Sequence, residues 1–170
     1  MRHLRPHRRT CRVPARAPQR GLTLVELMVA LTIAALLLVS AAPYFSDYIG
    51  NSRLREGGNL LLSEALMAQN EAVKRNNRVR LVTDGTSIQV QDFSTGAAVV
   101  LRTRVLTGNV YAPQATVEFT GDGRLSTWPT AARIDLSATS IVCSDEMRCP
   151  ALVIEAGGAV RLCGNQLSCS

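Results

Sequence analysis

A run of 21 residues from Leu22 to Ala42 contains one charged side chain, the carboxylate of Glu26. The run has about the length that a helix needs to cross the hydrocarbon core of a bilayer. A carboxylate at that depth costs about 2.5–3.5 kcal/mol on insertion scales, so it is normally retained because another group pairs with it. The sequence therefore predicts a transmembrane helix over residues 22–42 in which another group pairs with Glu26.

The positive charge of the chain is concentrated before this run. The formal net charge is +6, yet seven arginines and no acidic residue lie within residues 1–21. Without that segment the chain has 12 basic and 13 acidic residues and is nearly neutral. The positive-inside rule places residues 1–21 in the cytoplasm and the residues after Ala42 outside. A basic arm that binds nucleic acid is the competing interpretation of the arginines.

Residues 1–21 have the composition of a targeting segment, here a cleaved basic leader. The stretch Gly21-Leu22-Thr23-Leu24-Val25-Glu26 resembles the class III signal of type IV pilins and pseudopilins. The resemblance implies that a prepilin peptidase cuts after Gly21 and that the new N-terminus, Leu22, is methylated. It also implies that Glu26 attracts the N-terminal amine of a neighbouring subunit. An amine and a carboxylate that pair across packed helices reduce the cost of placing each charge in lipid.

Two other targeting signals are alternatives. An ordinary secretory signal would be cut near the small residues 40–42, but Pro43 follows directly and Glu26 interrupts the apolar core. A twin-arginine signal would use Arg8-Arg9, but the apolar run starts far downstream of that pair.

A helical pattern continues beyond Pro43, where we predict a kink rather than an end. Apolar and small residues recur at helical spacing, which predicts an amphipathic continuation over residues 43–76 within one helix from about Thr23 to Arg75. Glu71 and Arg75 have the spacing of a helix-surface ion pair. The predicted apolar side consists of Phe45, Ile49, Leu54, Gly58, Leu61, Leu62, Ala65, Leu66, Ala72 and Val73, and the other side of Arg53, Arg55, Glu56, Glu64, Glu71 and Lys74.

Residues 77–170 have the pattern of a β domain. Two alternating runs, 78–82 and 87–91, flank Asp84-Gly85, which is a strong hairpin signal. Further strands are predicted at 97–105, 116–120, 132–136, 152–155 and 159–163. The predicted fold class is α+β. A long, pilin-like N-terminal helix, first transmembrane and then amphipathic, packs on a C-terminal antiparallel β domain.

Four cysteines lie in the last 28 residues, at Cys143, Cys149, Cys163 and Cys169, while Cys11 falls in the leader. An even number of cysteines in an exported domain predicts disulfides, and four cysteines allow three pairings. We favour the local pairs Cys143–Cys149 and Cys163–Cys169, and the two cross-linked pairings stay open. The spacing, together with the absence of histidine after the leader, argues against a zinc site. No metal or other cofactor is predicted.

Further stretches resemble the GspH/FimT family of type II secretion pseudopilins and minor type IV pilins. They are residues 51–55, 63–65, 70–76, 119–124 and 158–163. The resemblance implies a minor subunit of either a type II secretion pseudopilus or a type IV pilus. The implied partners are the prepilin peptidase, other pilins or pseudopilins, and the inner-membrane assembly machinery. The chain is expected to cross the bacterial inner membrane once, with the GspH-like residues 77–170 in the periplasm.

DNA uptake is the alternative function. Members of the pilus branch are linked to it through a tail motif that resembles Gly-Arg-x-Arg, whereas this chain reads Gly158-Ala159-Val160-Arg161. Because one arginine is missing and the mature chain is nearly neutral, phosphate contacts at Arg161 would be few and salt-sensitive. Arg124, Arg133 and Arg148 could add to them if they shared one face.

An enzyme is not expected. Residues 22–170 contain no histidine, which removes histidine-dependent triads and metal sites. The sequence also lacks a Walker loop and a dinucleotide-binding glycine motif.

Overall fold

A computed structural model describes residues 21–127, 130–139 and 141–169, without the side chains of residues 42 and 43. The chain divides into two compact units, and the second begins at Ala42. Helix α1 runs from Leu24 to Arg75 and contributes residues to both units. This helix matches the one expected from about Thr23 to Arg75. It continues through residue 43, and the kink at Pro43 stays a prediction.

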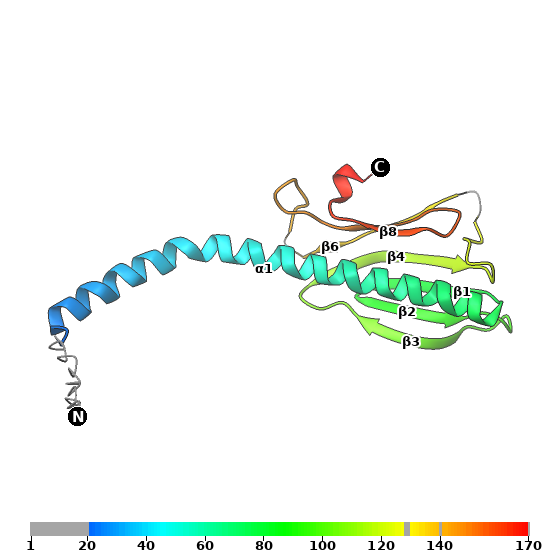
Figure 1. The fold of residues 1–170 in the computed structure, drawn as a ribbon, viewed down its shortest axis with the longest axis horizontal. Coiled ribbons are helices and arrows are strands. Elements are labelled where there is room, and N and C mark those ends of the chain that lie inside the picture. The colour runs from blue at the N-terminus through cyan, green and yellow to red at the C-terminus, as the bar shows by residue number, and fades with distance from the viewer. Residues whose placement is uncertain (1–20, 128–129, 140, 170) are drawn as a thin grey trace, which may run out of the picture. The chain divides into compact units, whose positions relative to one another are not determined.

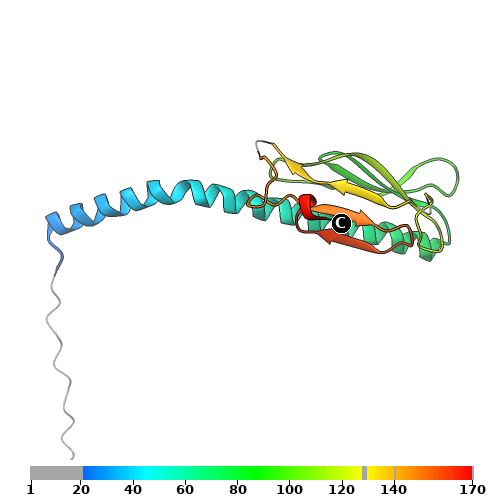
Figure 2. The same ribbon diagram turned by 90° about the horizontal axis from the view of Figure 1, so that it is seen from above.

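The second unit contains two antiparallel sheets (Figure 1 and Figure 2). The first sheet has the order β3-β2-β1-β4-β6, and the second has the order β5-β7-β8. In chain order the strands are β1 (Val79–Gly85), β2 (Ser87–Asp92), β3 (Val99–Val105), β4 (Val110–Phe119), β5 (Ala132–Asp135), β6 (Ser137–Ala138), β7 (Ala151–Ile154) and β8 (Val160–Cys163). A short 3-10 helix, η1 (Gln166–Ser168), follows β8.

The seven strands expected from the sequence are all present, but β4 starts earlier than expected and β6 was not foreseen. Pro113 concealed the first half of β4, because proline has no N–H for a ladder and is rare inside strands. The structure accommodates it where the β1–β4 register shifts between Thr83 and Gly85. There the buried Thr83 hydroxyl donates a hydrogen bond to the Pro113 carbonyl oxygen at 2.6 Å.

The second half of α1 packs against both sheets. Its buried stripe consists of Leu54, Leu61, Ala65, Ala68 and Ala72. Gly57 and Gly58 are adjacent but contact different sheets. A Cβ on Gly57 would lie 3.0 Å from Val110 Cγ1 of β4, and one on Gly58 would lie 3.0 Å from the Cγ of Pro150, which precedes β7. The absence of side chains at these positions lets the helix approach the two sheets closely.

The apolar side of α1 is narrower than the sequence pattern predicts. Phe45, Leu66 and Val73 were expected on it, but they are exposed by 66%, 40% and 51% respectively. Leu54 and Leu61 make the contact with the sheets together with small residues at close range, so the buried stripe is narrow. Ala68, which the predicted side omitted, is fully buried.

The position of Glu64 also differs from the prediction. Glu64 was predicted on the polar, exposed side of the helix, but it is buried and only 2% exposed. Its Oε1 atom lies 3.3 Å from Arg102 Nε and 3.5 Å from Arg104 Nε, both on β3. A buried carboxylate requires such partners, since an unpaired charge in the interior is very costly.

Arg75 links the end of α1 to β2 through ion pairs. Its Nε atom lies 2.8 Å from Glu71 Oε2, as the helical spacing predicts, and its Nη1 atom lies 2.9 Å from Asp92 Oδ2. The hydrogen bond from Arg75 lowers the pKa of Glu71, and hydrogen bonds from Ser94 lower the pKa of Asp92.

Truncation of Leu61 should destabilise the second unit far more than truncation of Leu66. Leu61→Ala removes a fully buried side chain and should lower the free energy of unfolding by about 2–5 kcal/mol. The matched control Leu66→Ala, at a 40% exposed position, should cost less than about 1 kcal/mol. Denaturant unfolding of the full chain in detergent, followed by circular dichroism, measures both. Equal losses would contradict the narrow stripe.

Acid should weaken the Arg75 network. Because the pKa values of Glu71 and Asp92 are lower in the folded chain than their ordinary 4.5 and 3.8, the unfolded chain binds more protons as the pH falls through this range. The stabilisation is therefore present above the ordinary values and is lost as the pH falls through the folded ones. Arg75→Gln should lower Tm near neutral pH, and the difference from wild type should shrink as the pH falls below the ordinary pKa values of the two carboxyl groups. A difference in Tm that stays constant with pH would contradict the assignment.

Candidate functional site

The first turn of α1 is capped by Thr23. Gly21, Leu22 and Thr23 precede the helix without regular secondary structure. The Thr23 hydroxyl oxygen accepts a hydrogen bond from the Glu26 N–H at 3.2 Å, and the Thr23 carbonyl accepts one from the Leu27 N–H at 3.1 Å. Thr-x-x-Glu is the spacing of a capping box. The hydrophobic pattern of the sequence does not indicate this cap, but the Thr-x-x-Glu spacing of residues 23–26 does.

Glu26 lies exposed in this first turn. Within the described part of the chain, no hydrogen bond or ion pair engages its carboxylate. The N-terminal end of a helix carries partial positive charge, which stabilises a carboxylate there. The helix end therefore stabilises the negative group at this position.

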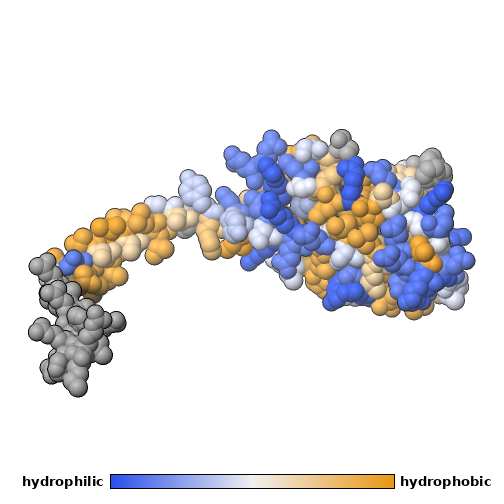
Figure 3. Space-filling model, in the orientation of Figure 1, coloured by the Kyte–Doolittle hydropathy of each residue, from blue (hydrophilic) through white to orange (hydrophobic). Residues whose placement is uncertain are grey.

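The helix segment after Glu26 is apolar on all sides. Large apolar side chains from Leu27 to Val39 are exposed by 51–76%, and they cover this part of the helix in Figure 3. The segment Leu24–Ala41 has 18 residues and a mean hydropathy of 2.4, so it is long and apolar enough to cross a membrane.

The two hydroxyl donors of this segment are satisfied within the helix. Thr32 Oγ1 donates to the Val29 carbonyl oxygen at 2.8 Å, and Ser40 Oγ donates to the Leu36 carbonyl oxygen at 3.0 Å. Unsatisfied polar groups are costly in hydrocarbon, so this arrangement suits a lipid environment.

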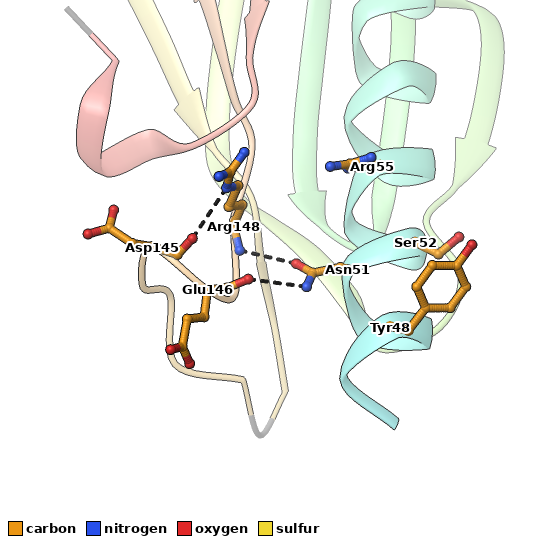
Figure 4. A pocket seen from close by; sticks show the side chains of 7 residues that line it. All are labelled: Tyr48, Asn51, Ser52, Arg55, Asp145, Glu146 and Arg148. Atoms are coloured by element: carbon orange, nitrogen blue, oxygen red, sulfur yellow. Dashed lines mark hydrogen bonds between the residues drawn. The ribbon is translucent and has the colours of Figure 1, made fainter. Parts of the chain in front are cut away.

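In the second unit, Asn51 attaches a disulfide-closed loop to α1 (Figure 4). The loop lies between Cys143 and Cys149, which form a disulfide. Asn51 Nδ2 donates to the Glu146 carbonyl oxygen at 3.3 Å, and Asn51 Oδ1 accepts from the Arg148 N–H at 3.1 Å. One amide side chain therefore serves two backbone groups of the loop. The cavity beside it, about 400 Å³, is lined by Tyr48, Asn51, Ser52, Arg55, Asp145, Glu146 and Arg148.

The C-terminal segment is closed by the second disulfide, Cys163–Cys169. Both disulfides thus join local pairs, one of the three pairings that the sequence allows. Arg133 holds the segment on the second sheet, since its Nη2 donates to the Gln166 carbonyl oxygen at 2.7 Å. The Gln166 N–H donates to the Cys149 carbonyl oxygen at 2.7 Å, which connects the two disulfide segments.

Gln69 of α1 connects two turns that lie far apart in sequence. Its Nε2 atom donates to the carbonyl oxygens of Gly123 and Gly158, at 2.8 and 2.6 Å. Gly158 has φ +96°, and a Cβ there would overlap the Gly123 carbonyl oxygen. Gly158, the first residue of the tail motif, is therefore required by packing.

Three of the four arginines considered for DNA contact pair with carboxylates. Arg161 Nε is 3.3 Å from Glu155 Oε1, and Arg133 Nε is 2.6 Å from Asp135 Oδ1. Both arginines stand opposite Val153 in the register of the second sheet, so they share one face. Arg124 pairs with Asp122 in a turn, and Arg148 belongs to the loop held by Asn51. The four do not form one uncompensated basic surface.

No group of three histidine, cysteine, aspartate or glutamate side chains that could hold a metal ion occurs among the described residues.

Two family profiles match the chain. The profile for the prokaryotic N-terminal methylation motif matches residues 16–42, and the profile for the type II transport protein GspH matches residues 58–166. None of the curated proteins matches the chain.

Crystal structures of the type IV minor pilin FimU from Pseudomonas aeruginosa are similar in fold. One has a TM-score of 0.55 at 18% identity and covers 65% of this chain and 88% of FimU. A second crystal form has a TM-score of 0.52 at 18% identity and covers 64% of this chain and 90% of FimU. The predicted α+β, pilin-like fold class is confirmed.

Substitution of Gly158 should damage the fold, while substitution of its neighbour should not. Gly158→Ala places a Cβ against Gly123 at a positive φ and should lower the free energy of unfolding by about 2 kcal/mol or more. Gly157→Ala is the matched control, because no atom lies within 4 Å of its added Cβ. Denaturant unfolding of the two variants measures the difference. A Gly158→Ala variant as stable as Gly157→Ala would leave the glycine without a structural reason.

Proposed function

Because the chain belongs to the family of the type II transport protein GspH, we propose that it is a minor subunit of an inner-membrane type IV filament machine. One observation carries the proposal, namely a methylation motif and a GspH domain joined by a single helix. The machine is either a type II secretion pseudopilus or a type IV pilus. The family description favours the former, and the likeness in fold to a type IV minor pilin favours the latter.

The first step in this function is removal of the leader. A prepilin peptidase cuts after Gly21, and the new N-terminus at Leu22 is methylated. The position of Gly21 supports this step, because the residue is exposed, lies outside α1 and has no atom within 4 Å of an added Cβ. The methylation-motif profile covers the same residues.

The second step is assembly through Glu26. The amine at Leu22 pairs with the Glu26 carboxylate of a neighbouring subunit, and the pair fixes the axial position of one helix against the next. The apolar surface from Leu22 to Val39 lies in lipid before assembly and against neighbouring helices afterwards. An exposed apolar surface of this length requires one of these environments.

Location and partners follow from the same features. The basic leader lies in the cytoplasm, residues 22–42 cross the inner membrane once, and residues 77–170 lie in the periplasm. Two disulfides suit an oxidising compartment. The partners are the prepilin peptidase, other pilins or pseudopilins and the assembly machinery. DNA contact at Arg161 remains an alternative with less support, since Glu155 offsets its charge.

Intact-mass measurement tests the processing step. Protein extracted from membranes should begin at N-methylated Leu22. A mature chain beginning at Pro43 would mean removal of an ordinary secretory signal and would overturn the proposal.

Loss of the Glu26 carboxylate should block assembly without blocking insertion. Glu26→Gln should reach the membrane in normal amount, yet its recovery in sheared filaments should fall by about tenfold or more, as expected for loss of a charge pair in lipid. Glu56→Gln removes an exposed carboxylate of the same helix and is the matched control. Immunoblots of the membrane and filament fractions measure both variants. Equal recovery of Glu26→Gln and wild type would refute the pairing.

A further inference from the structure

The first sheet ends in an exposed strand, β3. In the sheet order β3-β2-β1-β4-β6, β3 is the edge that pairs with β2 alone. Val99, Val100 and Val105 on this strand are exposed by 55%, 51% and 59%. A seven-residue edge rich in valine is a ready template for another strand, and proteins usually protect such edges.

The outward-facing backbone groups of β3 can be assigned. The Leu106 N–H donates to the Thr86 carbonyl oxygen, so the ladder to β2 uses residue 106. Bonded residues alternate in an antiparallel ladder, and Arg104 and Arg102 follow at two-residue steps opposite Ile88 and Val90. The N–H and C=O groups of Thr103 and Val105 therefore point away from the sheet.

The side chains at this edge carry excess positive charge. Arg102 and Arg104 lie on the face of β3 that meets α1, where both contact Glu64. Among the described residues one carboxylate, that of Glu64, pairs with the two guanidinium groups, so one positive charge is in excess there. The two arginine side chains are still 38% and 48% exposed, so a further acidic group can reach them.

The positive charge of Arg102 and Arg104 determines which kind of strand can pair with the β3 edge. A second copy of the chain, paired antiparallel about Thr103, would place Arg102 opposite Arg104 of the copy, and like charges directly opposite are destabilising. The basic residues 1–21 are disfavoured for the same reason. An acidic strand is favoured. Because side chains alternate between the faces of a strand, its other side chains would lie on the opposite face of the sheet, beside Thr103 and Val105 of β3, and Val105 is 59% exposed.

We propose that the β3 edge is a docking site for an extended strand of a neighbouring filament subunit, with acidic side chains two residues apart opposite Arg102 and Arg104. The strand adds to the first sheet through Thr103 and Val105, and its acidic side chains meet the two arginines. The assignment to a neighbouring subunit rests on the proposed function, whereas the chemistry of the edge does not.

Peptide binding to the full chain in detergent tests the site. The probe is a fluorescein-labelled, capped peptide of alternating valine and glutamate, and binding is followed by anisotropy. We expect saturable binding that weakens several-fold when salt is raised from about 50 to about 500 mM. The same peptide with lysine in place of glutamate should bind at least about tenfold more weakly. Equal binding of the two peptides, or binding of neither, would overturn the proposal without any change to the protein.

A pair of variants tests the backbone contact. Thr103→Pro removes one outward N–H and leaves the ladder to β2 in place, so it should weaken binding by about tenfold. Thr103→Val retains the N–H and should bind as wild type does. Unchanged binding by Thr103→Pro, with its Tm preserved, would overturn the proposal. Sedimentation of the chain alone tests whether a second copy occupies the β3 edge. A dimer that Thr103→Pro abolishes would assign the edge to a second copy and overturn the proposal.

The Glu26→Gln variant separates this proposal from the filament function. Its acidic-peptide binding should equal that of wild type even when its recovery in filaments is lost. Failure of filament recovery therefore bears on Glu26, and failure of peptide binding bears on β3.

Discussion

The second unit depends on the close approach of α1 to two sheets at once. At Gly57 the nearest side chain belongs to Val110 of the first sheet, and at Gly58 it belongs to Pro150 beside the second. A larger side chain at either glycine would push the helix away from one sheet, because protein interiors have few voids to absorb it. The buried alanines further along the helix extend the same contact. Small size at these positions, more than hydrophobicity, sets how the two sheets meet the helix.

The sequence predicted those elements whose signal lies in neighbouring residues. The apolar run, the helical spacing and the alternating runs gave the helix and seven strands, because each depends on a pattern within a short stretch. The first half of β4 escaped, since Pro113 is tolerated only through a register shift against β1. The two-residue β6 is too short to leave a pattern. Gly21, Leu22 and Glu26, the residues proposed for processing and assembly, belong to one contiguous motif, and their roles stay predictions.

The polar groups inside the second unit could not be predicted in this way. The sequence pattern places Glu64 on the helix surface, and only the tertiary structure shows that two arginines of β3 pair with it. Gln69 contacts turns that are 54 and 89 residues away in sequence, so no local pattern indicates its partners. Asn51 likewise contacts backbone groups that are 95 and 97 residues away in sequence. These contacts are tertiary, because each joins residues that are far apart in the sequence.

The cap of α1 bears on how the helix would respond to removal of the leader. Both residues of the cap, Thr23 and Glu26, lie on the C-terminal side of Gly21. A chain that starts at Leu22 keeps both of the hydrogen bonds that Thr23 accepts in the first turn, from the N–H groups of Glu26 and Leu27. Under the proposed cleavage after Gly21, the first turn would therefore not need to melt and reform. That cleavage would change the charge and the covalent length of the N-terminus and leave the helix start as it is.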